Sequence, residues 1–378
     1  MKKEIIDTTL RDGEQAPGVS FSLREKRDIA MKLMEAGVDE IEAGIPIMGS
    51  ETIELIRCLS AESSSTRISS WARLREEDMR AAYKAKSDLI HFTVPLSDYH
   101  LGRQIGYWDD VKAKMFRILM MAKDLFPYVS VGFQDSFRAP KDRLDEACSL
   151  AEELGIYRIR FSDTVGTALP SDVDALICRY RSAYSGVIDF HGHNDLGLAA
   201  ANSLTALESG ADSINVTVNG IGERAGNASL EQLAFILHFH KSLDTSISLD
   251  KIKEMSAMVA DFSGRSVAVD RPIVGTLAFT HESGIHCHGQ LGNPLAYQPF
   301  DPREKGLPPS SIVVGSHSGK AGVIGVLRAA GIRDSEKVVA GLMDVYRNRS
   351  RSKKNFLSQQ EVLEIYKDNK GRKNEYLR

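Results

Sequence analysis

Two histidines separated by one residue offer the clearest candidate chemistry in this sequence. His191 and His193 follow a largely apolar run, residues 187–190, that has the composition of a β-strand. In a strand, residues i and i+2 point to the same side, so both imidazoles would face one point and could hold one metal ion. Asp12 follows another strand-like run and is the candidate third ligand. Such a ligand set leaves positions on a divalent ion open for substrate oxygens.

The composition is that of an ordinary globular protein. The chain has 378 residues, of which 42% are hydrophobic, enough for one large α/β domain with an extension. The formal net charge of -3 gives no electrostatic reason to expect a nucleic-acid partner. The four cysteines show neither a paired metal spacing nor a disulfide framework, which favours a reducing compartment. No run resembles a signal peptide or a membrane span, so we expect a cytoplasmic protein without a membrane partner.

Short β-rich runs alternate with helical periodicity over the first two thirds of the chain. Ser22 and Glu25 form a capping box that opens a helix, and Gly37 would end this helix after Ala36. Such alternation favours parallel strands joined by crossover helices, and eight units close a TIM (β/α)8 barrel. An open, doubly wound sheet is the alternative. The expected strands are residues 4–10, 40–46, 67–73, 88–95, 128–134, 158–164, 187–193 and 213–220.

A barrel predicts that functional side chains gather at the carboxyl ends of its strands. Polar residues occur at these ends or just before them. They are Arg11, Asp12, Glu42, Arg73, Gln134, Asp135, Asp163, Thr164, His191, His193 and Asn219. The glycine-rich turn at residues 219–227 could bring backbone amides close to an anion or a metal-bound substrate. Its spacing does not match the dinucleotide-binding fingerprint.

Three motifs in order carry a resemblance to a known family. Residues 8–15, 191–195 and 220–227 resemble motifs of the DRE-TIM metallolyases, specifically the Claisen-condensing branch. That branch includes 2-isopropylmalate, citramalate, Re-type citrate and homocitrate synthases. The chain is most similar to the homocitrate synthases of nitrogen-fixing bacteria in its compact length and in residues 279–286 and 314–320. The resemblance runs from residue 4 to beyond residue 320.

The resemblance implies a domain organisation. A TIM-barrel catalytic domain is expected over residues 1–265, a linker and first subdomain over 266–325, and a helical second subdomain over 326–378. Together the last two would form a small, mostly helical carboxy-terminal extension that covers the barrel mouth. From the compact length we expect no carboxy-terminal regulatory domain like that of the leucine-regulated isopropylmalate synthases. A homodimer is also expected from the resemblance.

The implied reaction is condensation of acetyl-CoA, as co-substrate, with a 2-oxo acid. The resemblance assigns Asp12, His191 and His193 to a divalent ion, which could be Mg²⁺, Mn²⁺ or Zn²⁺. This ion would polarise the 2-oxo group as a Lewis acid. Asn227 is a further candidate at the metal site, and Gln15 would orient the site.

Other site residues follow from the same resemblance. Arg11 would stabilise the alkoxide that forms when the acetyl carbanion attacks. Thr164 would bind the substrate carboxylate. His286 matches a catalytic histidine that removes the methyl proton, and Tyr297 matches a tyrosine that assists this transfer. The chain departs from the family at Gln134, where a glutamate is usual, and glutamine cannot accept a proton.

The departure at Gln134 leaves several interpretations open. Asp135 could take part of the missing role, the proton transfer could depend on the histidine and tyrosine alone, or the substrate could differ. Arg73 could hold the distal carboxylate of the 2-oxo acid bidentately, and His100 is another pocket candidate. Arg73 favours 2-oxoglutarate. A 2-isopropylmalate, citramalate or Re-type citrate synthase is the alternative within the branch, the last because oxaloacetate also has a distal carboxylate. A metal-dependent aldolase or lyase and a non-catalytic metal-binding barrel are the alternatives from other classes.

Overall fold

The computed structural model describes residues 2–105, 107–333 and 336–375. The chain divides into two compact units, Met1–Val267 and Ala268–Arg378, and each is described by itself. Among the described residues, no helix combines the length and the apolar composition that crossing a bilayer requires.

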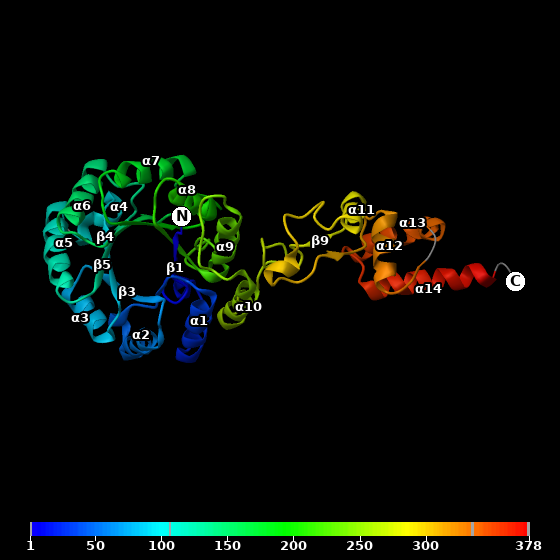
Figure 1. Cartoon of the computed structure of the whole chain (residues 1–378), viewed down its shortest axis with the longest axis horizontal. Helices are drawn as coiled ribbons and strands as arrows, with labels where there is room; N and C mark the ends of the chain where they lie inside the picture. Colours follow the sequence, from blue (N-terminus) through cyan, green and yellow to red (C-terminus); the bar gives the residue numbers. More distant parts are fainter. Residues whose placement is uncertain (1, 106, 334–335, 376–378) are drawn as a thin grey trace. The chain divides into compact units, whose positions relative to one another are not determined.

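Eight parallel strands close the first unit into a barrel, which confirms the expected TIM fold (Figure 1). Each strand pairs with the next along the chain, and the last strand returns to pair with the first. This closure excludes the open, doubly wound sheet. The strands are β1 (Glu4–Asp7), β2 (Glu40–Glu42), β3 (Arg67–Arg73), β4 (Leu89–Pro95), β5 (Tyr128–Gln134), β6 (Arg158–Asp163), β7 (Val187–Gly192) and β8 (Ser213–Val216).

Helices surround the barrel, as crossovers between parallel strands require (Figure 1). Ser22 and Glu25 form the predicted capping box of α1, and Gly37 ends this helix at a left-handed φ of 84°. The helices are α1 (Leu23–Ala36), α2 (Ser50–Glu62), α3 (Glu76–Ala85), α4 (Asp98–Ile105), α5 (Trp108–Lys123), α6 (Lys141–Glu153), α7 (Pro170–Arg181), α8 (Ala199–Glu208), α9 (Leu230–Phe239) and α10 (Ile252–Ser263). Short 3₁₀ turns lie at η1 (Gly13–Gln15), η2 (Pro46–Met48), η3 (Val218–Gly220) and η4 (Leu249–Lys251).

The first and last strands are shorter than the sequence predicts. β1 ends at Asp7, because the Asp7 carboxylate accepts hydrogen bonds from the N–H and the hydroxyl of Thr9 at 2.8 and 3.0 Å. These bonds turn the chain away from the sheet. β8 ends at Val216, and Asn219 in the 3₁₀ turn that follows has a φ of 58°. The candidate residues near these ends, Asp12 and Asn219, therefore lie on turns beyond the strands.

Charged side chains fill the barrel interior, where branched apolar residues usually pack. Arg158 on β6 is fully buried and donates to both carboxylate oxygens of Glu40, at 2.7 and 2.8 Å. Arg67 donates to the same carboxylate at 2.8 Å. Burial opposes ionisation of Glu40, but the charges of Arg158 and Arg67 outweigh it and lower its pKa to about 2. Arg160 and Glu42 form a second buried ion pair. Each lies two residues after its counterpart in the first pair, closer to the carboxyl ends of the strands.

The second unit is mostly helical, as expected for the carboxy-terminal extension. One apolar core joins its last three helices and includes Val323, Val339, Tyr346 and Val362. The boundary expected between residues 325 and 326 falls inside helix α12 (Lys320–Ala329). The division of this unit into two subdomains stays a prediction. The elements are β9 (Thr280–His281), α11 (Gly284–Gly292), η5 (Pro302–Lys305), β10 (Ser311–Ile312), α12 (Lys320–Ala329), α13 (Glu336–Lys353) and α14 (Gln359–Glu375).

The ion pair at the base of the barrel predicts a large stability effect. We expect Glu40→Gln to lower the free energy of unfolding by about 3–5 kcal/mol at pH 7, because it leaves the Arg158 charge buried without its partner. Glu62→Gln is the matched control, since Glu62 pairs with Arg27 at the surface; it should cost less than about 1 kcal/mol. Urea titration measures both values.

The same pair predicts a pH dependence. The pKa of Glu40 is about 2 in the folded protein and 4.5 in the ordinary carboxyl. Its ionisation therefore stabilises the fold above the higher value, and this stabilisation is lost as the pH falls towards the lower one. The difference between wild type and Glu40→Gln should shrink over that window. Equal effects of Glu40→Gln and Glu62→Gln at pH 7 would contradict the account.

Candidate metal centre and active site

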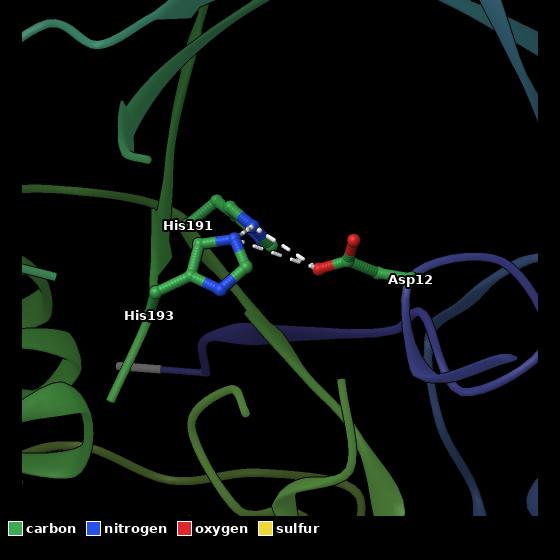
Figure 2. Close-up of side chains that lie close together, drawn as sticks. All are labelled: Asp12, His191 and His193. Carbon is green, nitrogen blue, oxygen red and sulfur yellow. Dashed lines mark hydrogen bonds and ion pairs between the residues drawn. The ribbon is translucent and has the colours of Figure 1, made fainter. Parts of the chain in front are cut away.

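Three side chains that lie far apart in the sequence meet at the carboxyl end of the barrel. Asp12 lies in the turn after β1, His191 lies in β7, and His193 directly follows that strand. Asp12 Oδ2 is 3.4 Å from His191 Nε2 and 3.8 Å from His193 Nε2, and the two Nε2 atoms are 3.2 Å apart. Figure 2 shows the three side chains clustered, with the dashed lines joining these atoms. The structure thus brings the three predicted ligands together.

The spacing of these atoms fits one divalent cation. Ligand atoms about 2.1 Å from a metal lie roughly 3.0–3.4 Å apart at octahedral or tetrahedral angles. The three distances in the site are close to this range. Asp12 Oδ2 is buried and receives no hydrogen bond from any residue that the structure describes. Leaving such an oxygen unsatisfied is costly, and a bound cation would satisfy it.

The electrostatic environment prepares the same groups for a metal. Burial lowers the pKa of His191 to about 3, although the charge of Asp12 opposes this shift. Burial lowers the pKa of His193 as well. Burial disfavours the charged form of Asp12, but Arg11 and the two imidazoles together bring the pKa of this carboxyl below its ordinary value. At neutral pH the site therefore offers two neutral imidazoles and a carboxylate, the forms that bind metals.

Arg11 is fixed beside these ligands. Its Nη1 donates to Asp12 Oδ1 at 2.7 Å, and its Nε donates to the buried carboxylate of Glu42. Its guanidinium carbon lies 5.8 Å from the centre of the Trp71 ring. A positive charge held in this way can stabilise negative charge that develops near the metal site without first having to reorganise.

A cavity of 310 Å³ has these four residues in its wall. Its size suits a small organic acid. Of the other predicted site residues, Gln15, Gln134 and Thr164 also line it. The remaining wall residues are Trp71, His91, Thr93, Arg160, Ser162, Glu223 and Arg224.

Asn227 lies next to the metal ligands along the backbone. It pairs with His193 in an antiparallel bridge, and its Nδ2 donates to the carbonyl oxygen of Ile221 at 3.0 Å. Its Oδ1 is buried and has no hydrogen-bond partner among the described residues. The close approach needs a glycine, because a Cβ on Gly222 would lie 2.2 Å from Asn227 Nδ2. Asn227 does not line the cavity, and its role at the metal site stays a prediction.

Two neighbouring polar residues at the end of β5 have different surroundings. Gln134 lines the cavity. Asp135 has a left-handed φ of 59°, and its carboxylate accepts hydrogen bonds from Arg138 at 2.7 and 2.8 Å. His100 Nδ1 lies 3.2 Å from the same carboxylate, and the N–H of Asp135 donates to Thr164 Oγ1 at 2.9 Å. The Asp135 carboxylate is therefore already engaged by a cation.

Arg73 and His100, predicted to bind the distal end of a substrate, do not line the cavity. The Arg73 guanidinium instead binds Asp78 in the first turn of α3, with Nε–Oδ2 and Nη2–Oδ1 distances of 2.9 and 2.8 Å. The Asp78 carboxylate also accepts the N–H of Arg73 at 3.0 Å.

In the second unit, the predicted proton-transfer pair is in direct contact. The rings of His286 and Tyr297 are stacked, with centroids 4.3 Å apart and an interplanar angle of 21°. The nearby His281 is held by Gln290, whose side-chain nitrogen is 2.9 Å from His281 Nε2.

Some cavity residues lie inside the strands rather than at their ends, and the sequence patterns above do not single them out. For Arg160 and Ser162 a signal exists, because every second residue from 158 to 164 is polar. In a strand this pattern places the polar side chains on one face.

Comparisons with known proteins cover both units. The HMGL-like family matches residues 2–259, and the homocitrate synthase post-HMGL domain-like family matches residues 273–354. The HMG-CoA lyase of Brucella melitensis has a similar fold, with a TM-score of 0.60 and 19% sequence identity over 70% of this chain and 99% of that one.

Two relatives match nearly the whole chain. Homocitrate synthase 1 of Nostoc sp. is 38% identical over 97% of this chain and 98% of its own length. The 2-isopropylmalate synthase 2 of Caldanaerobacter subterraneus is 36% identical over 96% of this chain and 95% of its own. The chain belongs to the HMGL-like family, within the group that contains these homocitrate and 2-isopropylmalate synthases.

Proposed function

We propose that this protein condenses acetyl-CoA with a 2-oxo dicarboxylic acid and releases free CoA, with 2-oxoglutarate as the preferred acid and homocitrate as the product. Relatives of nearly full coverage support an acetyl-CoA-dependent synthase that acts on a 2-oxo acid. The observation that carries the proposal is the convergence of Asp12, His191 and His193 beside Arg11 in one cavity.

The chain's own residues supply orientation and charge at the carbonyl of the 2-oxo acid. A divalent ion held by Asp12, His191 and His193 would polarise this carbonyl as a Lewis acid. Arg11 faces the same place with a fixed positive charge, which stabilises the oxygen as it becomes an alkoxide. Thr164 lies in the wall and offers a hydroxyl to the substrate carboxylate.

The acetyl methyl group must lose a proton before it attacks. We assign the removal of this proton to His286, assisted by Tyr297, whose ring is stacked on the imidazole. Acid–base help of this kind is worth about 10²- to 10⁴-fold in rate. Gln134 can orient a substrate oxygen by hydrogen bonding but accepts no proton, so the second-unit pair carries the transfer in this proposal.

The choice of an acidic substrate is supported by the cationic groups of the cavity wall. Three arginines, Arg11, Arg160 and Arg224, line it. Carboxylates pair with all three, but Arg160 keeps one buried N–H group without a partner among the described residues. This donor and a bound divalent cation would favour 2-oxoglutarate or oxaloacetate over the apolar acids that citramalate and 2-isopropylmalate synthases would use.

A lyase or aldolase and a non-catalytic barrel remain the alternatives from other classes. The match of residues 273–354 to a domain that follows the barrel in homocitrate synthases supports the synthase instead. The homodimer implied by the resemblance stays a prediction.

A substrate panel tests the proposed function. Purified protein with Mg²⁺, Mn²⁺ or Zn²⁺ and acetyl-CoA is given 2-oxoglutarate, oxaloacetate, pyruvate or 2-oxoisovalerate, and the release of CoA thiol is followed. We expect the highest kcat/KM with 2-oxoglutarate. A higher value with pyruvate or 2-oxoisovalerate would contradict the proposed substrate, and thiol release from none of the acids would contradict the synthase.

Metal binding has a test that needs no turnover. We expect His191→Ala to weaken Mn²⁺ binding at least about 100-fold, because it removes one of three ligands. His240→Ala is the matched control, since His240 pairs with Glu208 on the outside of the barrel. Titration calorimetry measures both affinities. Unchanged Mn²⁺ affinity in His191→Ala would refute the assigned ligand set.

Gln134 provides a test of the departure from the family. We expect Gln134→Glu to retain or raise kcat with 2-oxoglutarate, because glutamate has the same length and adds a proton acceptor. Steady-state kinetics at equal metal content give the answer. A fall in kcat of more than about tenfold would show that the glutamine is itself adapted to the reaction.

A further inference from the structure

Arg160 on β6 is a buried cation with one donor group left over. Its side chain is 2% exposed. Its Nε donates to Asp189, and its Nη1 donates to Glu42 Oε2 at 2.8 Å. Its Nη2 is buried and has no hydrogen-bond partner among the residues that the structure describes. A buried donor on a charged group is rarely left unpaired unless something else binds it.

The position of Arg160 relates this donor to the metal ligands. Arg160 lines the same cavity as Asp12, His191 and His193. In the pairing of β6 with β7, Ser162 lies beside His191 and Arg160 lies beside Asp189. Arg160 is therefore two residues, or about 7 Å along the strand, closer to the amino ends of the strands than His191. This separation matches the short carbon chain between the two ends of a small dicarboxylic acid.

The neighbouring strand leaves space at this level. Gly132 on β5 is in register with Arg160, and a Cβ at Gly132 would lie 2.5 Å from His91 Nε2. Because Gly132 has no side chain, the His91 ring packs against it, and His91 and Thr93 both line the cavity. Burial, followed by the charge of Arg160, lowers the pKa of His91 well below its ordinary value, so this ring is a neutral hydrogen-bonding group.

We propose that Arg160, through Nη2, binds the distal carboxylate of the 2-oxo acid and makes the cavity selective for dicarboxylic substrates. This inference rests on the proposed function and assigns its specificity to a residue inside the barrel. Glu42 and Asp189 fix the guanidinium, so binding a carboxylate at Nη2 costs little side-chain freedom. A substrate that ends in a methyl group would leave Nη2 buried and unpaired, and the cavity would reject it.

Two other arginines, Arg158 and Arg73, differ from Arg160 because they do not line the cavity. Arg158, two residues earlier on the same strand, donates from Nε to Ser130 and from both Nη atoms to Glu40, and it does not line the cavity. Arg73 is held by Asp78 outside the cavity wall. Arg158 is therefore a matched control with the same burial and a completed set of partners.

The test compares 2-oxoglutarate with 2-oxopentanoate, which has the same number of carbons but a methyl group in place of the distal carboxylate. The ratio of kcat/KM for the two acids is measured in wild type, Arg160→Gln, Arg160→Lys and Arg158→Lys. Lysine keeps a positive charge for Glu42 and Asp189 but ends short of the Nη2 position. Arg160→Lys therefore still tests the role of Nη2 if the glutamine variant does not fold.

We expect wild type to prefer 2-oxoglutarate. The preference should fall about 10- to 100-fold in Arg160→Gln, the range for loss of a hydrogen bond to a charged group, and several-fold in Arg160→Lys. In Arg158→Lys the ratio should stay within about twofold, because that residue does not meet substrate. Calorimetry with 2-oxoglutarate and Mg²⁺, without acetyl-CoA, should show the same weakening for the Arg160 variants.

The possible failures are distinguishable. Wild type that releases thiol but does not discriminate the two acids, or an unchanged ratio and unchanged 2-oxoglutarate affinity in both Arg160 variants, would overturn the role of Arg160. An equal loss of selectivity in Arg158→Lys would overturn it too. Wild type that binds 2-oxoglutarate through Arg160 yet releases no thiol would instead contradict the proposed synthase reaction.

Discussion

The site depends on the ion pairs between the carboxylate of Glu42 and two arginines. This carboxylate is fully buried on β2, and the two arginines share it, with Arg11 on one oxygen and Arg160 on the other. Burial alone would raise its pKa, but the charges of Arg11 and Arg160 outweigh this effect and keep the pKa well below the ordinary range. A buried carboxylate in this position costs desolvation energy, and only two well-placed cations can compensate for it.

This shared carboxylate fixes the two arginines that are proposed to meet opposite ends of the substrate. On one side it fixes Arg11, which in turn binds Asp12 beside the two histidines. On the other side it fixes Arg160, whose position is completed by Asp189. The proposed metal ligands, the charge proposed to stabilise an alkoxide and the charge proposed to bind a distal carboxylate are thus held in place before substrate arrives. Such preorganisation is the main source of electrostatic catalysis in enzymes.

Much of the barrel could be predicted from the sequence, because strand and helix signals depend on local residues. The capping box at Ser22 and Glu25 and the full extent of β3 and β5 follow from such patterns. The convergence of Asp12 with His191 and His193 follows from one further rule, that strands of a barrel place functional groups at their carboxyl ends.

The remaining features depend on which partner each side chain meets in the folded protein. Arg73 occupies a strand end, yet Asp78 five residues later binds its guanidinium, and the sequence alone does not decide between that partner and a ligand. Arg160 lies within a strand, away from the carboxyl end where functional residues were expected. Its role depends on which face of β6 points inward and on the space left by Gly132 on the neighbouring strand. Register between strands determines both, and register is not a local property.

The most direct measurement of the central claim is anomalous diffraction from crystals grown with Mn²⁺. The account predicts one anomalous peak about 2.0–2.3 Å from Asp12 Oδ2 and from the Nε2 atoms of both histidines. A peak elsewhere in the barrel, with Asp12 and the two imidazoles outside coordination distance, would contradict it.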